Sequence, residues 1–151
     1  MAAVELGKRM ATSRNARGDY LESAGDVAAM FMEELRYERK EHFRAVLINT
    51  KGQIISVDHV SVGELSSTVV HPREVFGEAV RKSAASVILV HNHPSGITDP
   101  SSSDVDFTWK LEAVLNPLDI TLLDHLIVSR IGVYSFLNHG LLKVRYGNRT
   151  R

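Results

Sequence analysis

Residues 86–94 read Ser-Val-Ile-Leu-Val-His-Asn-His-Pro, a short apolar run that leads directly into two histidines. Such a run, bounded by polar residues, is typical of a strand buried on both faces of a sheet. Because successive side chains on a strand alternate between its faces, we expect His91 and His93 to point the same way. A loop rich in Gly and Pro follows, and functional residues of α/β sheets commonly lie in such loops.

The spacing of apolar residues and turn signals predicts the elements on either side of this run. Three helices are expected: the first covers 24–39, the second begins at Pro72, and the third runs from Ser101 until Pro117 stops it. The expected strands are 43–48, the returning strand or strands at 53–62, 86–90, 121–128 and 133–137. This order predicts an α/β fold in which helices flank a mixed β-sheet.

The domain organisation predicted from the sequence is simple. Residues 1–18 contain a short helical start and a small, polar stretch, which together predict a linker or the remnant of an N-terminal region. A chain of 151 residues suits one compact domain, which we place at 19–140. Residues 141–151 are expected to form a basic C-terminal tail that is solvated, with a partner or nucleic-acid contact as the alternative.

Composition narrows the chemistry that the chain can perform. There is no cysteine, which excludes thiolate catalysis, disulfides and cysteine-based zinc sites, so a metal site must use histidines and carboxylates. The 18 basic and 18 acidic residues give a net charge of +0. General nucleic-acid binding depends on surplus Lys and Arg, so this balance argues against it while leaving room for a local basic patch.

The sequence also carries signals about location. No apolar run approaches the roughly 20 residues that span a bilayer, which predicts no membrane partner. The N-terminus lacks the charged and then apolar pattern of a signal peptide. We therefore expect a cytoplasmic domain.

Asp104 follows His93 by eleven residues and is expected in the first turn of the third helix, from where its carboxylate can return to the histidines. Two imidazoles and a carboxylate are a ligand set for catalytic zinc, with water in the open position. An alternative explanation is structural. Ser101 and Asp104 stand three residues apart at a helix start, where they could form only a capping pair.

A hydrolase that uses zinc also needs a base to accept a proton from water. Glu41 is the candidate, because it opens the first predicted strand and could reach a neighbouring strand end. The alternative is that Glu41 belongs to a solvated cluster of charges beside the first helix. Glu64 offers a second acidic residue near a predicted strand.

The pattern His91-x-His93-Pro94, followed by Ser101-x-x-Asp104 and preceded by an upstream Glu, resembles the JAMM (MPN+) metalloproteases. Three separated blocks, at 70–76, 84–96 and 123–128, resemble the bacterial RadC branch of that superfamily. The resemblance covers roughly residues 41–136 and implies the JAMM/MPN, cytidine-deaminase-like architecture. Residues 3–9 resemble the junction after the helix-hairpin-helix region of full-length RadC proteins, so a catalytic-domain fragment or a naturally short relative is expected.

The resemblance also implies a function and a site. His91, His93 and Asp104 match the ligands of one Zn²⁺ per chain, Glu41 matches the general acid/base, and Ser101 matches the residue that stabilises the oxyanion. The implied reaction is hydrolysis of a peptide or isopeptide bond by a metal-activated water. The implied substrates are peptides or conjugates of a ubiquitin-like protein.

Other interpretations of these residues remain. His91-Asn92-His93 superficially resembles an HNH nuclease, but that site spreads its residues over a longer ββα unit. A DNA-repair module and a non-catalytic interaction module are the alternative functions; zero net charge weakens the first, and the intact ligand set counts against the second. Asp124 and His125 are interpreted as a buried, hydrogen-bonded structural pair.

Overall fold

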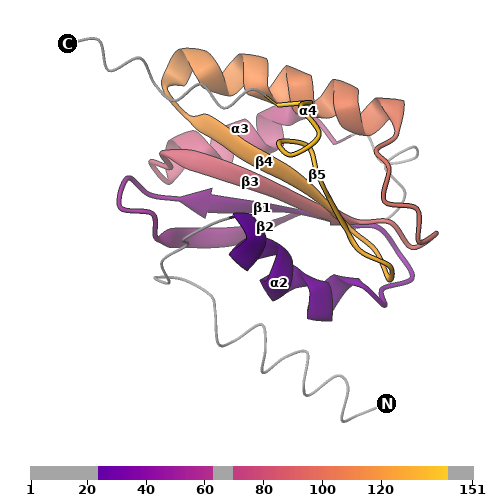
Figure 1. Cartoon of the computed structure of the whole chain (residues 1–151). Helices are drawn as coiled ribbons and strands as arrows, with labels where there is room; N and C mark the ends of the chain where they lie inside the picture. Colours follow the sequence, from indigo (N-terminus) through magenta and orange to yellow (C-terminus); the bar gives the residue numbers. More distant parts are fainter. Residues whose placement is uncertain (1–23, 63–69, 143–151) are drawn as a thin grey trace.

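The computed structural model describes residues 24–62 and 70–142 and confirms the α/β fold class (Figure 1). The helices are α2 (Ala24–Leu35), α3 (Pro72–Arg81) and α4 (Ser102–Leu115), with a 3-10 turn η1 (Asn116–Leu118) after the last. The strands are β1 (His42–Ile48), β2 (Ile54–Val62), β3 (Ser86–Asn92), β4 (Thr121–Val128) and β5 (Val133–Ser135). The predicted linker at 1–18, residues 143–151 of the predicted tail, and Glu64 lie outside the described residues.

The strands form one mixed sheet in the order β2-β1-β3-β4-β5. Strand β1 is antiparallel to β2 and β3, β4 is parallel to β3, and β5 is antiparallel to β4. A parallel pair needs a long crossover connection, which α4 supplies between β3 and β4. Strand β3 is therefore central, with a hydrogen-bonded neighbour on each side.

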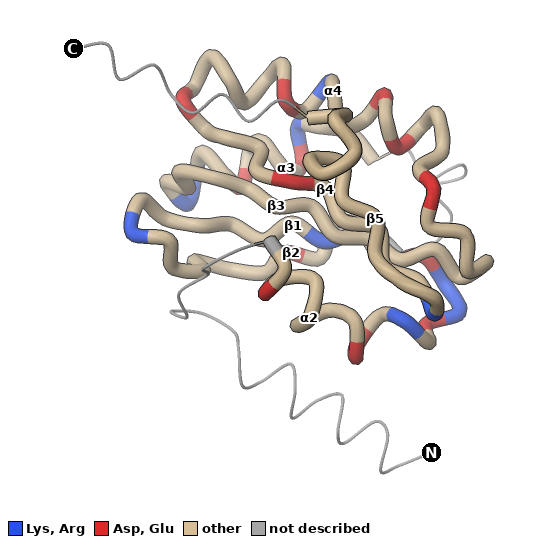
Figure 2. The backbone as a smooth tube through the Cα atoms, in the orientation of Figure 1, with Lys and Arg blue, Asp and Glu red and all other residues tan. Residues whose placement is uncertain are grey.

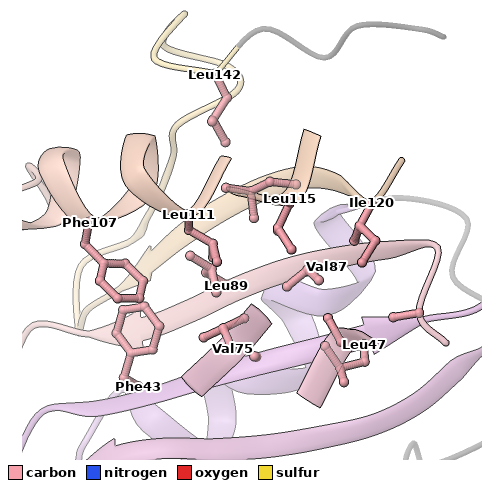
Figure 3. Packing of buried hydrophobic residues seen from close by; sticks show 14 of the residues in the cluster. Phe43, Leu47, Val75, Val87, Leu89, Phe107, Leu111, Leu115, Ile120 and Leu142 are labelled. Atoms are coloured by element: carbon pink, nitrogen blue, oxygen red, sulfur yellow. The ribbon is translucent and has the colours of Figure 1, made fainter. Parts of the chain in front are cut away.

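Helices cover both faces of this sheet, α3 and α4 on one and α2 on the other (Figure 1). Neighbouring residues of β3 alternate between the two cores, so Leu89 packs on the α3/α4 side and Val90 on the α2 side. Figure 3 shows the first core, where the rings of Phe43 and Phe107 meet with centroids 5.1 Å apart. Two residues beyond Leu89, His91 therefore lies on the face that α4 covers.

The structure corrects the predicted end of the first helix. Helix α2 ends at Leu35 and not at residue 39, and Glu38 N donates to Leu35 O (3.1 Å) in the turn that follows. Its buried stripe of Val27, Phe31 and Leu35 also ends there. Because no later residue of this segment continues the stripe onto the sheet, the chain turns toward β1.

The last strand is also shorter than predicted, ending at Ser135 and not at residue 137. Leu137 N donates to the Asp124 carboxylate (3.0 Å), and Asn138 N donates to the Ser135 hydroxyl (3.1 Å). These side-chain acceptors replace ladder partners, so the backbone turns away from β4.

Charged residues of both signs occur on several elements, with Lys and Arg among Asp and Glu (Figure 2). Arg44 of β1 is an exception to surface placement, since it is only 5% exposed and forms an ion pair with Glu34 of α2. This pair ties α2 to the sheet. Within the described segments, no helix has the length and apolar character that crossing a membrane requires.

Helix α3 offers a matched test of this packing. Val75 is 1% exposed in the core, whereas Val80 on the same helix is 49% exposed. We expect Val75→Ala to lower the free energy of unfolding by about 2 kcal/mol, because it removes buried methyl groups and leaves a cavity. Val80→Ala should change it by less than about 0.5 kcal/mol. Urea denaturation of both variants measures the difference, and equal losses would contradict this placement of α3.

Candidate metal centre

The end of β3 brings His91 and His93 to one side of the sheet, as the sequence predicts. His91 is paired in register with Phe43 of β1, and their rings stack with centroids 5.4 Å apart. Beyond the strand, His93 N donates to Val128 O of β4 (2.9 Å), which keeps the backbone on the sheet for one more residue. His91 is fully buried, and the His93 side chain is 11% exposed at the rim.

Asp104 reaches the same place from the first turn of α4. Its backbone N–H donates to Ser101 Oγ (3.1 Å), and its Oδ2 accepts from Ser101 N (2.8 Å). The predicted capping pair is therefore present as a reciprocal capping box. The same bonds fix the direction of the carboxylate, so the structural and the ligand interpretations of Asp104 are compatible.

The predicted ligand atoms converge. His91 Nε2 lies 2.9 Å from His93 Nε2 and 3.4 Å from Asp104 Oδ1, and His93 Nε2 lies 3.3 Å from Asp104 Oδ2. One ligand atom from each residue can be chosen so that all lie within 4.8 Å of one another. Two atoms that bind the same zinc ion at about 2.0–2.2 Å can be no farther apart than twice that distance. The three contacts of 2.9, 3.4 and 3.3 Å satisfy this limit. The three residues therefore could hold a metal ion.

The donor chemistry also fits a metal cation. The Ile97 carbonyl can only accept, so its 2.8 Å contact with His93 Nδ1 requires a hydrogen on that nitrogen and, in the neutral ring, leaves a lone pair on Nε2. Asp104 Oδ1 is buried and has no hydrogen-bond partner within the described part of the chain. An unsatisfied buried carboxylate oxygen is costly, and a cation would remove that cost.

Electrostatics lead to the same conclusion. Burial alone would raise the pKa of Asp104, but the nearby rings of His91 and His93, together with the Ser101 N–H, outweigh it and hold that pKa well below its usual range. Burial alone would lower the pKa of His93, yet the Asp104 carboxylate and the Ile97 carbonyl raise it, with a smaller contribution from the charge of Glu41. The site thus favours positive charge.

Glu41 lies immediately before β1 and is half-buried. Phe43 is paired with His91, so continuing this antiparallel register by two residues puts Glu41 opposite His93. The contribution of Glu41 to the pKa of His93 agrees with that position. The structure therefore places the predicted base beside the ligand set.

Asn92 holds Glu41 in this position, a role that was not predicted from the sequence. Its Nδ2 donates to Lys40 O (2.9 Å), and its Oδ1 accepts from His42 N (2.7 Å), so one buried amide binds the backbone on both sides of Glu41. The signal was present in the sequence, since an amide between two same-facing histidines must point to the other face of the strand. Its hydrogen-bond partners could not be identified from the local pattern, because they lie 50 and 52 residues away.

Asp124 and His125 are buried and hydrogen bonded, as predicted, but their side chains bind different partners. Asp124 accepts from His125 N (2.7 Å) and from the Ser135 hydroxyl (2.5 Å), whereas the His125 ring lies with Nε2 2.7 Å from His91 Nδ1. Adjacent strand residues point to opposite faces, which separates the carboxylate from the ring. Complete burial lowers the pKa of His125 well below its ordinary value.

Ser101 lies at the exposed rim of this group. Its Oγ accepts from Asp104 N, so its position depends on the capping box at the start of α4. The structure thus brings the predicted ligands together and places Ser101 and Glu41 next to them, on different elements.

Known proteins resemble this chain over nearly all of the described region. A family model described as the RadC-like JAB domain matches residues 21–141. A UPF0758 protein of Caldanaerobacter subterraneus subsp. tengcongensis is 48% identical over 128 residues, which cover 85% of this chain and 55% of that protein. UPF0758 proteins of Alkaliphilus metalliredigens and Rubrobacter xylanophilus are 41% and 43% identical over 142 residues, or 94% of this chain. The chain spans 61% and 62% of the length of these two relatives.

Metal binding is the direct test of this geometry. We expect the wild-type chain, purified with transition metals present, to retain roughly one ion per chain. His91→Ala and Asp104→Ala should each lose it, because only two protein ligands remain. Elemental analysis measures the stoichiometry, with His139→Ala as the control, since His139 stacks on Tyr134 and is absent from the ligand group. A wild-type chain without bound metal would contradict the interpretation.

Proposed function

The chain belongs to the family of RadC-like JAB domains, and on that premise we propose that it is a zinc-dependent hydrolase of peptide or isopeptide bonds. The family assignment confirms the resemblance of the three sequence blocks. The observation that supports an enzyme is the convergence of His91 Nε2, His93 Nε2 and an Asp104 oxygen at a strand end beside Glu41. A non-catalytic interaction module would have no need for this set of donors.

His91, His93 and Asp104 would hold the ion, and three protein ligands are the number that catalytic zinc sites use. A bound zinc ion would supply Lewis acidity, polarising the substrate carbonyl and lowering the pKa of water. Imidazole and carboxylate donors also suit other transition metals, so zinc is part of the proposal.

Glu41 and Ser101 would handle the proton and the charge. Glu41 accepts a proton from the attacking water and then delivers it to the leaving amine, a role that requires its carboxylate to face the same space as the ligands. Ser101 Oγ already accepts from Asp104 N, and its own hydrogen can be donated to the oxyanion that develops on the carbonyl. The capping box would thus orient both a ligand and an oxyanion donor.

The substrate class follows from the resemblance: peptides, or conjugates in which a ubiquitin-like protein is joined to lysine. The chain covers 55% and 61% of the lengths of two compared relatives. The activity of a whole relative is therefore only proposed for this domain.

The role of Glu41 can be separated from metal binding. We expect Glu41→Gln to keep the ion but to lower kcat by about 10²-fold or more, because the amide cannot accept the proton. A library of fluorogenic peptides and lysine-branched isopeptides, incubated with the zinc-loaded chain, provides the assay. Glu33→Gln is the control, since Glu33 is a 69% exposed side chain on α2.

If Glu41→Gln keeps full turnover, the base must be sought elsewhere, with Glu64 as the next residue to replace. If the wild-type chain binds zinc but cleaves no member of the library, whereas it binds DNA at physiological salt, the repair-module alternative gains support.

The amide of Asn92 generates a second test. Asn92→Ala removes both hydrogen bonds that flank Glu41, so we expect kcat to fall by roughly 10-fold while KM and zinc stoichiometry change little. Steady-state kinetics on the best substrate of the library measure the split. Asn138→Ala, at an exposed asparagine, is the control. Loss of zinc from Asn92→Ala would show that the amide instead supports the ligand strand.

A further inference from the structure

Behind the ligand set, a chain of hydrogen bonds runs through three fully buried side chains, each 0% exposed: His91, His125 of β4 and Thr108 of α4. His91 Nδ1 lies 2.7 Å from His125 Nε2, and His125 Nδ1 lies 2.6 Å from Thr108 Oγ1. Thr108 Oγ1 in turn lies 2.6 Å from the backbone oxygen of Asp104. This hydrogen-bond network thus begins at one predicted ligand, His91, and ends at the backbone of another, Asp104.

Counting the available hydrogens shows which group donates in each hydrogen bond of this network. The Asp104 carbonyl has no hydrogen, so its contact with Thr108 uses the hydroxyl hydrogen. Thr108 then has no hydrogen left for His125, so His125 Nδ1 must donate to Thr108 Oγ1. A neutral His125 carries no second hydrogen, which makes its Nε2 the acceptor from His91 Nδ1.

The last step leaves the neutral His91 ring without a hydrogen on Nε2, the atom that faces His93 and Asp104. We infer that Thr108 and His125 are positioning residues that hold His91 in the tautomer whose Nε2 lone pair can bind the metal. The inference rests on the proposed metal site but not on the peptidase reaction. The opposite direction would leave two oxygens 2.6 Å apart with no hydrogen between them and would put a hydrogen on the ligand nitrogen.

Aromatic side chains hold the rings in this arrangement. His125 stacks on Phe136 with centroids 4.5 Å apart, and Phe43 meets His125 edge-on at 5.5 Å. His91 stacks against the ring of Phe43, which thus contacts both histidines. Since both histidines are fully buried, the side chain opposite His91 Nδ1 has to serve as its acceptor, in place of the bulk water available to an exposed ring.

The hydrogen-bond network also links two predicted metal ligands, Asp104 and His91, through α4. Asp104 contributes its carboxylate to the site, while its carbonyl oxygen receives the Thr108 hydroxyl one helical turn later. Through Thr108 and His125, the first turn of α4 is connected to His91 on β3 by side-chain hydrogen bonds. Ligands from two separate elements are therefore held by one network, as expected for the outer shell of a metal site.

The test compares the zinc affinities of variants of the 151-residue chain at one fixed pH, by competition with a chromophoric chelator. Thr108→Val keeps the shape and removes the hydroxyl, and we expect zinc affinity to fall by about 10- to 100-fold. Thr108→Ser keeps the hydroxyl and should restore most of the affinity. Thr121→Val, a matched change on β4 away from the network, should leave affinity unchanged.

A second measurement reads the tautomers directly and does not depend on any variant folding. Long-range ¹H–¹⁵N spectra of the ring nitrogens should show a hydrogen on Nδ1 of both His91 and His125 and a bare His125 Nε2, with and without zinc. The His91 Nε2 should be bare when zinc is bound. A hydrogen on His125 Nε2 would overturn the inference, as would wild-type zinc affinity in a folded Thr108→Val chain. If the wild-type chain binds no zinc, the proposed function fails. The tautomers of His91 and His125 then still show whether the hydrogen-bond network has the inferred direction.

Discussion

The position of β3 in the sheet determines every other part of the candidate site. It hydrogen bonds to β1 on one side and to β4 on the other, so residues from three strands meet at its C-terminal end. Continuing the register between β1 and β3 by two residues puts Glu41 opposite His93, and β4 brings His125 against His91. The crossover that makes β4 parallel to β3 is α4, whose first turn supplies Asp104. The connection that the topology requires is thus also the element that completes the ligand set.

Burying this group of side chains is expensive without a cation. Asp104 is 2% exposed and His91 0%, and the capping box satisfies Asp104 Oδ2 but leaves Oδ1 to the site. A buried carboxylate favours neighbouring positive charge, and two imidazole nitrogens 2.9 Å apart favour a cation or a proton between them. The metal interpretation explains both features with one ion.

Local sequence signals predicted most of the fold and the ligands, because each of those features depends on residues close together in the chain. The alternation of β3 orients His91 and His93, and the Ser101–Asp104 spacing predicts the cap that the structure contains. The role of Asn92 depends on the register between β1 and β3, which the local pattern does not contain. The contact between His125 and His91 depends similarly on the pairing of β4 with β3, including a register shift at Val87/Ile88.

The absence of cysteine explains why this outer layer is needed. A thiolate has no tautomers, whereas an imidazole can bind a metal through Nε2 only if its hydrogen is on Nδ1. His93, at the rim, meets this condition through the carbonyl of Ile97 in the adjacent loop. His91 lies within the sheet, where backbone carbonyls are engaged in strand pairing, so its acceptor comes from a side chain on β4. A buried His-based site therefore needs a second buried side chain with a defined hydrogen of its own, and Thr108 fixes that hydrogen on His125.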